Sequence, residues 1–342
     1  MSKLNVTKVI DQWGWAYHHI VQEMQRYTSH NIIAQRFNEI NYADVDVMYI
    51  SSPNISRNIS IEVIPAACKA KGIKTIGAYS GEVDMKYNES VDLIVTISPQ
   101  LYFYAKKNYP NTPVVFLPES IDTNFFLPVE RPIDRFIPGW AGGPNKAVKR
   151  RHLFDYLIYP VKQMCEHGPQ YFVQNANLDK MKDFYASIDC FVLPSSTECM
   201  PRVVMEAMAS GLAVVATDVG AISMLLQQPF IVPVNPEGVL VYEMNKRLEI
   251  LSQQPGFRKK IGERNREYIE QNFSWAINQT IWDEVFSLLK DGQIGEILKI
   301  SDNFMAKFPG SFEEAKFAEH ITKFEKPSVT MQSVRPGIGK RR

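Results

Sequence analysis

The sequence has few cysteines, no long apolar run and almost no net charge. Its four cysteines lack C-x-x-C spacing, which argues against a metal site and favours reduced thiols. The opening residues MSKLNVTKVIDQWGW lack the apolar centre of a signal peptide, and no apolar run reaches the roughly eighteen residues of a membrane span. A net charge of +1 gives the chain no overall attraction to nucleic acid or membrane. We therefore expect a cytoplasmic protein, with peripheral membrane attachment left open.

A G-x-G-x-x-G pattern is also missing after the first expected strand, which argues against a dinucleotide-dependent dehydrogenase. Short apolar runs instead alternate with helical patterns. Strands are expected at 6–10, 46–51, 74–78, 92–97, 114–117, 136–141, 171–174, 188–193, 212–217 and 230–233. Helices are expected at 16–28, 58–71, 100–108, 201–208, 238–252, 256–272, 275–289 and 294–308. This alternation predicts parallel α/β sheets, and 342 residues suffice for two domains.

The segment 185–226 carries the strongest functional signal. Its apolar run 188–193 is expected to be a buried strand, followed by a loop and a helix that starts near Pro201. Glu198 lies in the loop and Glu206 inside the helix. The N–H groups at a helix N-terminus favour anions, and a carboxylate can accept paired hydrogen bonds from a vicinal diol. The pattern indicates a site for hydroxylated groups on either side of a phosphate.

The string E-C-M-P-R-V-V-M-E-A-M-A-S-G-L-A-V-V-A-T-D-V-G, residues 198–220, resembles the Glu-x7-Glu signature of retaining glycosyltransferases of family 4. The resemblance implies the GT-B fold: two Rossmann-like α/β domains that face each other across a cleft, with a C-terminal helix crossing back to the N-terminal domain. It also implies that Glu206 holds the ribose of the nucleotide. The residues implied to face the donor sugar are Glu198, Cys199, Met200 and Pro201. Cys199 stands where the family usually has Gly.

A glycine loop followed by basic residues, 139–151, resembles the diphosphate-binding loop of the same family, without its usual Arg. The resemblance implies that Lys149 neutralises the donor diphosphate, with Lys146 or Arg150 in support. The implied nucleotide-binding set is Gly142, Gly143, Lys146, Lys149, Arg150 and Glu206. The implied catalytic residues are Lys149 and Glu198. No metal is expected, because fixed positive groups can stabilise the leaving group. No cofactor is expected beyond the cosubstrate, a UDP- or GDP-sugar.

The acceptor side is expected in loops that follow strands of the first domain. Gly14 and Trp15 follow the first strand. Ser80 and Glu82 follow the strand 74–78, at the place of a family His that this chain lacks. The run 117–128 resembles the segment that closes the first domain in the family, with Glu-Ser in place of Asn-Gly. The acceptor itself is not encoded in any pattern that we can identify.

The expected domains are an N-terminal Rossmann-like acceptor-side domain and a C-terminal Rossmann-like donor domain, followed by smaller elements. Their ranges are 1–125, 126–274, a crossover helix 275–290, a helical extension 291–326 and a basic tail 327–342. The tail has no acidic residue and no hydrophobic period, so disorder is expected. A weak contact of this tail with anionic lipid or nucleic acid is left open, as is the oligomeric state.

The resemblance implies a retaining glycosyltransferase that moves a sugar from a nucleotide-sugar to an acceptor hydroxyl on a glycan, a lipid-linked sugar or a protein. The alternatives are a hydroxylated base in DNA as acceptor, a GT-B epimerase or phosphorylase, and a non-catalytic sugar-nucleotide binding protein. The near-zero net charge weakens the DNA alternative, because phosphate binding needs a basic face.

Overall fold

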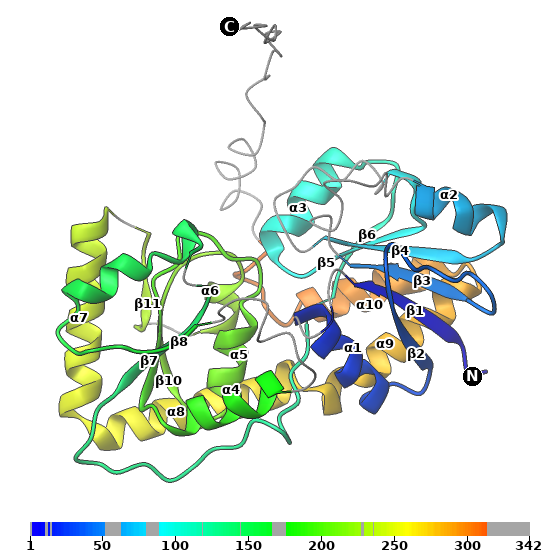
Figure 1. The fold of residues 1–342 in the computed structure, drawn as a ribbon. Helices are drawn as coiled ribbons and strands as arrows, with labels where there is room; N and C mark the ends of the chain where they lie inside the picture. Colours follow the sequence, from blue (N-terminus) through cyan, green and yellow to red (C-terminus); the bar gives the residue numbers. More distant parts are fainter. Residues whose placement is uncertain are drawn as a thin grey trace, which may run out of the picture.

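The computed structural model describes residues 2–10, 13, 16–51, 63–79, 89–117, 119–143, 145–165, 176–226, 229–234 and 236–312. Within these ranges the chain forms two parallel sheets, each with helices on both faces (Figure 1). The predicted pair of Rossmann-like α/β units is therefore confirmed. None of the described helices combines the length and hydropathy that crossing a membrane requires.

The first sheet has the strand order β2-β1-β3-β4-β5-β6, and all its strand pairs are parallel. Its strands are β1 Asn5–Ile10, β2 Asn31–Arg36, β3 Val47–Ile50, β4 Lys74–Tyr79, β5 Leu93–Thr96 and β6 Val114–Phe116. The helices that follow are α1 Ala16–Tyr27, α2 Val63–Ala70 and α3 Pro99–Asn108. These strands are rich in Val and Ile because helices cover the sheet on both faces.

Side chains of the first sheet alternate between two apolar layers. Val6 and Ile10 of β1 pack with α1 and with α9, Trp275–Lys290, whereas Val9 packs on the opposite face with α2 and α3. Figure 1 shows α2 and α3 above the sheet and α1 and α9 below it. The same two-residue period places Lys8 on the α1 and α9 face, between two apolar residues.

The second sheet has the strand order β11-β10-β9-β7-β8, again with parallel pairs. Its strands are β7 Pro138–Gly142, β8 Lys162–Cys165, β9 Cys190–Leu193, β10 Ala213–Thr217 and β11 Ile231–Val232. Its helices are α4 Ala176–Ala186, α5 Arg202–Ala209, α6 Ile222–Leu225, α7 Glu237–Gln253 and α8 Pro255–Asn272, with short 3-10 helices at Ala147–Lys149 and Arg151–Tyr156. This half therefore presents the carboxyl ends of its strands along one edge.

Two chain segments that connect the halves run side by side. The Ile121 amide donates to the Phe273 carbonyl at 2.8 Å, and the Trp275 amide donates back to the Ile121 carbonyl at 3.2 Å. From this point α9 returns to the first half, where Trp275 stacks on Tyr27 of α1 with ring centroids 6.0 Å apart. Ser274 precedes α9 as expected, but its hydroxyl donates to the Glu270 carbonyl at 2.7 Å rather than capping α9.

Helix α10, Ile294–Met305, covers the outer edge of β6. Buried Ser301 accepts a hydrogen bond from the Phe116 amide at 2.8 Å, which an edge strand would otherwise leave without a partner. Phe304 packs against the Phe116 ring with centroids 6.0 Å apart. The extension beyond the crossover helix thus completes the first sheet.

Ser301→Ala is expected to lower the free energy of unfolding by about 1–3 kcal/mol, because the buried Phe116 amide loses its acceptor. Urea unfolding measures the effect. Ser210→Ala is the matched control, since the buried Ser210 hydroxyl donates only to the Glu206 carbonyl of its own helix. Equal losses in the two variants would contradict the edge-capping role of Ser301.

The sequence patterns missed two strands of the structure, and a third, expected strand lies outside the described residues. Both missed strands, β2 and β8, are sheet edges with polar residues, so neither has the apolar run of a buried strand. The expected strand 171–174 and the tail from 313 lie outside the described residues. Helix α5 begins at Arg202, so Pro201 is its N-cap residue rather than its first helical residue.

Candidate functional site

The strand order of the second sheet has a topological switch point between β7 and β9. After β7 the chain adds β8 on one side of it, and then β9 pairs on the other side. Loops at the carboxyl ends of two such strands diverge and leave a crevice, where open α/β sheets bind their ligands. The segments after β7 and β9 contain Lys149 and Glu198, which were predicted from the sequence to act together.

Lys149 and Glu198, in the segments that follow these two strands, form an ion pair. The Lys149 Nζ donates to Glu198 Oε1 at 2.5 Å, and their side chains are 18% and 10% exposed. The backbone holds them together, because the Ser196 amide donates to the Val148 carbonyl at 2.8 Å. A cation and a carboxylate are therefore fixed at one point beside the amide end of α5.

Arg150 follows Lys149 with a left-handed backbone, at φ 47°. This conformation is unfavourable for a residue with a side chain and is often found at functional sites. Its Nη1 atom is buried and, among the described residues, has no hydrogen-bond partner, while its Nε lies 3.9 Å from Glu237 Oε1. A guanidinium N–H without a partner is suited to an anionic oxygen.

The loop after β10 supports the segment that carries Glu198. The Ala221 amide donates to the Cys199 carbonyl at 2.7 Å, and the Thr217 hydroxyl donates to the Ser195 carbonyl at 2.5 Å. Gly220 has φ +58°, and a Cβ atom there would lie 2.2 Å from the Glu198 carbonyl oxygen. Only glycine allows this approach of the two loops.

Gly220→Ala is expected to lower the free energy of unfolding by about 2–3 kcal/mol, since left-handed strain adds to a clash with the Glu198 carbonyl. Gly292→Ala is the matched control: its φ is +73°, but no atom lies within 4 Å of a Cβ there. Chemical unfolding of both variants separates strain from clash. A loss at Gly220 no larger than that at Gly292 would contradict the close approach.

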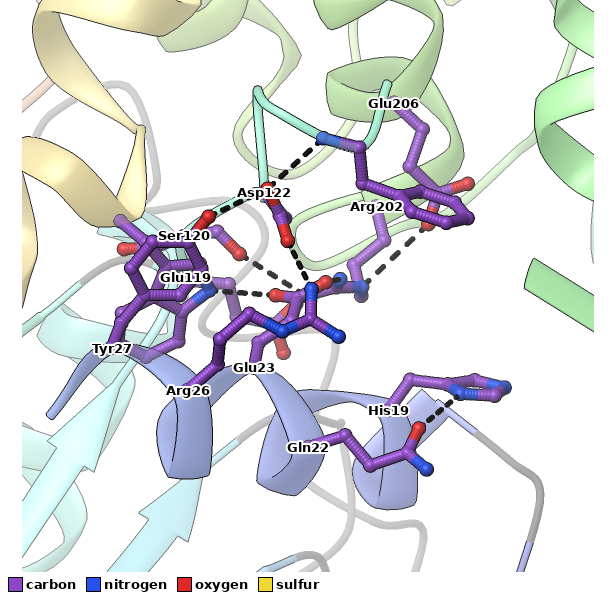
Figure 2. Close-up of polar contacts among 12 residues, drawn as sticks. His19, Gln22, Glu23, Arg26, Tyr27, Glu119, Ser120, Asp122, Arg202 and Glu206 are labelled. Carbon is purple, nitrogen blue, oxygen red and sulfur yellow. Dashed lines mark hydrogen bonds and ion pairs between the residues drawn. The ribbon is translucent and has the colours of Figure 1, made fainter. Parts of the chain in front are cut away.

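Glu206 lies on α5 with little exposure. Its Oε2 accepts from the Tyr185 hydroxyl at 2.8 Å. Its Oε1 lies 3.7 Å from Arg202 Nε, a contact drawn in Figure 2. Burial raises the pKa of the Glu206 carboxyl, against the lowering effect of Arg202 and of the Tyr185 hydrogen bond. Oε1 keeps lone pairs for a further donor, because a carboxylate has about four acceptor positions.

A buried polar cluster beside Glu206 was not predicted from the sequence. Arg202 of α5 reaches the first half, where its Nη2 donates to Glu23 Oε1 of α1 at 2.6 Å and its Nη1 lies 3.8 Å from Glu119 Oε2. Lys8 lines the same small cavity as Glu119. Two sequence features could have indicated this cluster. One is Lys8, the only charged residue in the apolar run VTKVI, and the other is the pair Glu119-Ser120, which replaces the family's Asn-Gly.

The remaining predicted residues fall into three groups. Met200 and Pro201 are buried, and Cys199 is half-buried with its carbonyl engaged by Ala221. Gly142 and Gly143 are half-buried at the end of β7, and Lys146 is exposed beside a cavity of about 380 Å³. The acceptor-side residues Gly14, Trp15, Ser80 and Glu82 lie outside the described residues.

In the described ranges no group of three or more His, Cys, Asp or Glu is arranged to hold a metal ion.

Comparisons with known proteins bear on the fold and on the class of reaction. A family model described as "Glycosyl transferases group 1" matches residues 159–248, which include Glu198 and Glu206. A sulfoquinovosyl transferase of Arabidopsis thaliana is 34% identical over 128 residues, which are 35% of this chain and 24% of that relative. The match thus spans about a quarter of the length of that relative.

Solved structures share the overall fold. A sucrose-phosphate synthase from Thermosynechococcus elongatus has a TM-score of 0.62 at 12% identity, over 85% of this chain and 100% of that chain. HepE of Anabaena in complex with UDP and glucose has a TM-score of 0.62 at 14% identity, over 83% of this chain and 99% of that chain. The fold of this chain is therefore the GT-B fold of these proteins.

Proposed function

We propose that the protein is a glycosyltransferase that transfers a sugar from a nucleoside-diphosphate sugar to an acceptor hydroxyl, with retention of anomeric configuration. The observation that carries this proposal is the Lys149–Glu198 ion pair at the switch point of the second sheet. The group 1 family match over residues 159–248 supports the same reaction class.

The leaving nucleoside diphosphate gathers negative charge as the sugar departs. Lys149 follows β7, as does Arg150, whose Nη1 has no hydrogen-bond partner within the described part of the chain, and α5 begins at Arg202, shortly after Glu198. Fixed donors of this kind stabilise developing charge without reorganising in the transition state. We therefore propose a metal-independent reaction in which Lys149 is the principal cation.

Glu198 is proposed to face the donor sugar. Its carboxylate is held by Lys149 and its backbone by the loop around Gly220. Half-buried carboxylate oxygens can accept hydrogen bonds from sugar hydroxyls. No described side chain is assigned as a covalent nucleophile, so the rate depends on alignment of donor and acceptor on one sugar face.

UDP is proposed as the first nucleotide to test, since the similar structure HepE was solved with UDP and glucose. The base, the sugar and the acceptor stay predictions, with a glycan, lipid-linked sugar or protein expected as acceptor. The test is release of nucleoside diphosphate from a panel of UDP- and GDP-sugars, with and without EDTA, followed by NMR of the product anomer. Retention without metal supports the proposal; an inverted product, or dependence on added metal, contradicts its mechanism.

Glu206 is proposed to hold the ribose through the lone pairs of Oε1. Removal of both ribose hydroxyls from the ligand is expected to weaken UDP binding to the wild type about 10- to 100-fold, the range for hydrogen bonds to a charged group. Calorimetry with UDP and 2′,3′-dideoxy-UDP measures this loss. In Glu206→Gln, which keeps the side-chain shape, the difference between the two ligands should shrink, because an uncharged amide oxygen accepts a weaker hydrogen bond than a carboxylate. An unchanged difference would assign the ribose to other groups.

A further inference from the structure

Arg202 links the two halves of the molecule through side chains buried between them. Its Nη2 donates to Glu23 Oε1 at 2.6 Å and its Nη1 donates to the Ser120 carbonyl at 3.2 Å, while its Nε lies 3.7 Å from Glu206 Oε1 (Figure 2). The Arg202 side chain is 10% exposed. One guanidinium thus contacts α1, the segment between the halves and the proposed ribose ligand.

Each end of this bridge has a further partner. On the first half, Glu23 Oε2 accepts from the Trp275 indole Nε1 at 2.6 Å. On the second half, Glu206 Oε2 accepts from the Tyr185 hydroxyl at 2.8 Å. A continuous line of hydrogen bonds and ion pairs therefore runs from α4 through α5 and α1 to the start of α9.

The charges in this line are not balanced. Three carboxylates, Glu23, Glu119 and Glu206, lie within 4 Å of the single Arg202 guanidinium. Burial raises the pKa of all three carboxyl groups, and Asp122 with its Arg26 partner adds a further carboxylate near Glu23. Lys8 is the other cation that faces Glu119. The guanidinium is shared among competing carboxylates, so a change at one alters its hold on the others.

We propose that Arg202 is a positioning residue that couples nucleotide binding in the second half to the arrangement of the first half. This inference rests on the proposed function, because it takes Glu206 as the ribose ligand. When ribose hydroxyls donate to Glu206, that carboxylate needs Arg202 less, and the guanidinium binds Glu23 more strongly. Nucleotide binding at the donor site thereby changes the contacts of α1 and α9, which belong to the acceptor-side half.

Trp275 provides a reporter that does not depend on catalysis. Its indole N–H donates to the carboxylate that Arg202 holds, so the indole signal in a ¹⁵N-tryptophan-labelled protein should move when UDP binds. Trp275→Phe assigns that signal. In Arg202→Met we expect UDP still to bind, about tenfold more weakly, without movement of the Trp275 signal. If Arg202→Met folds poorly, Arg202→Lys takes its place. Lysine keeps the positive charge but lacks the forked N–H groups of the guanidinium, so the Trp275 signal should move less than in the wild type.

A double-mutant cycle tests the same coupling by affinity. Glu23→Gln should weaken UDP binding about fivefold to tenfold in the wild-type background and less than twofold in Arg202→Met. Arg131→Met is the matched control, because Arg131 is a partly buried arginine that donates to the Ile188 and Ser210 carbonyls and touches neither glutamate. It should leave both the Trp275 response and the effect of Glu23→Gln intact.

The outcomes separate the inference from the function on which it rests. Two results overturn the coupling but leave the proposed function standing. In one, UDP binds to the wild type without moving the Trp275 signal; in the other, UDP moves this signal as far in Arg202→Met as in the wild type. Failure of the wild type to bind any nucleoside diphosphate contradicts the proposed function itself. Movement in the wild type that is lost with Arg202 and kept in Arg131→Met supports the inference.

Discussion

Lys149→Ala should lower the turnover number about 10²- to 10³-fold and change donor affinity by less than about tenfold. The reason is that Lys149 Nζ pairs with Glu198, with its side chain 18% exposed, at the place where we propose that the diphosphate gains a further negative charge as the sugar leaves. An interaction made mainly in the transition state affects turnover more than ground-state binding. Turnover of the donor that the panel identifies, together with calorimetric donor affinity, measures both quantities.

Two controls isolate the effect of charge at Lys149. Lys146→Ala removes an exposed cation from the same loop and should lower turnover only a few-fold. A comparison of Glu198→Gln with the double variant Lys149→Ala/Glu198→Gln measures the effect of Lys149 in a background where no carboxylate is left without its partner. If affinity and turnover fell by the same factor, Lys149 would be an ordinary binding residue.

Lys8→Met should stabilise the protein at neutral and acidic pH, and the gain should shrink as pH rises. Burial in the apolar layer between β1, α1 and α9 lowers the pKa of Lys8 from 10.5 to about 7, against the raising effect of Glu119. Because this folded-state pKa is depressed, the folded state disfavours the ammonium below pH 7, where the cost is full. Each unit of depression corresponds to about 1.4 kcal/mol.

Between pH 7 and pH 10.5 the unfolded chain binds the Lys8 proton and the folded chain does not, so wild-type stability rises with pH in this window. The stability difference between Lys8→Met and the wild type should therefore fall by about 1.4 kcal/mol per pH unit there. Urea unfolding across this range measures it. Lys71→Met, at an exposed position, is the control. A difference that does not change with pH would contradict the buried position of Lys8.

The sequence patterns predicted the central strands because these strands are short apolar runs. The strands β9 and β10, CFVL and AVVAT, are fully buried, and such runs are the strongest pattern in a parallel sheet. The edge strands β2 and β8 were missed because Asn, Gln, Arg and Lys interrupt their short apolar stretches. The edge contact between Ser301 and the Phe116 amide links residues far apart in the chain, which no local pattern encodes.

For the site, the resemblance predicted roles for Lys149 and Glu198, but it did not predict the contacts that fix them. Their 2.5 Å contact depends on the switch in strand order, which arises from pairing of β9 with β7. Arg202 lies within the matched string 198–220 but was given no role there, and its guanidinium extends from that helix to Glu23. Partners across two halves of a molecule follow from tertiary structure alone.

We expect the loops at the carboxyl ends of β7 and β9 to bind a nucleoside diphosphate. The most direct test is the melting temperature of the protein with a panel of nucleoside diphosphates and their sugars, without added metal. A ligand that binds only the folded state at 100 times its dissociation constant adds about 2.7 kcal/mol of stability. We predict a rise of several degrees with one diphosphate, expected to be UDP or GDP. An unchanged melting temperature with every member of the panel would contradict the donor site and, with it, the proposed transferase.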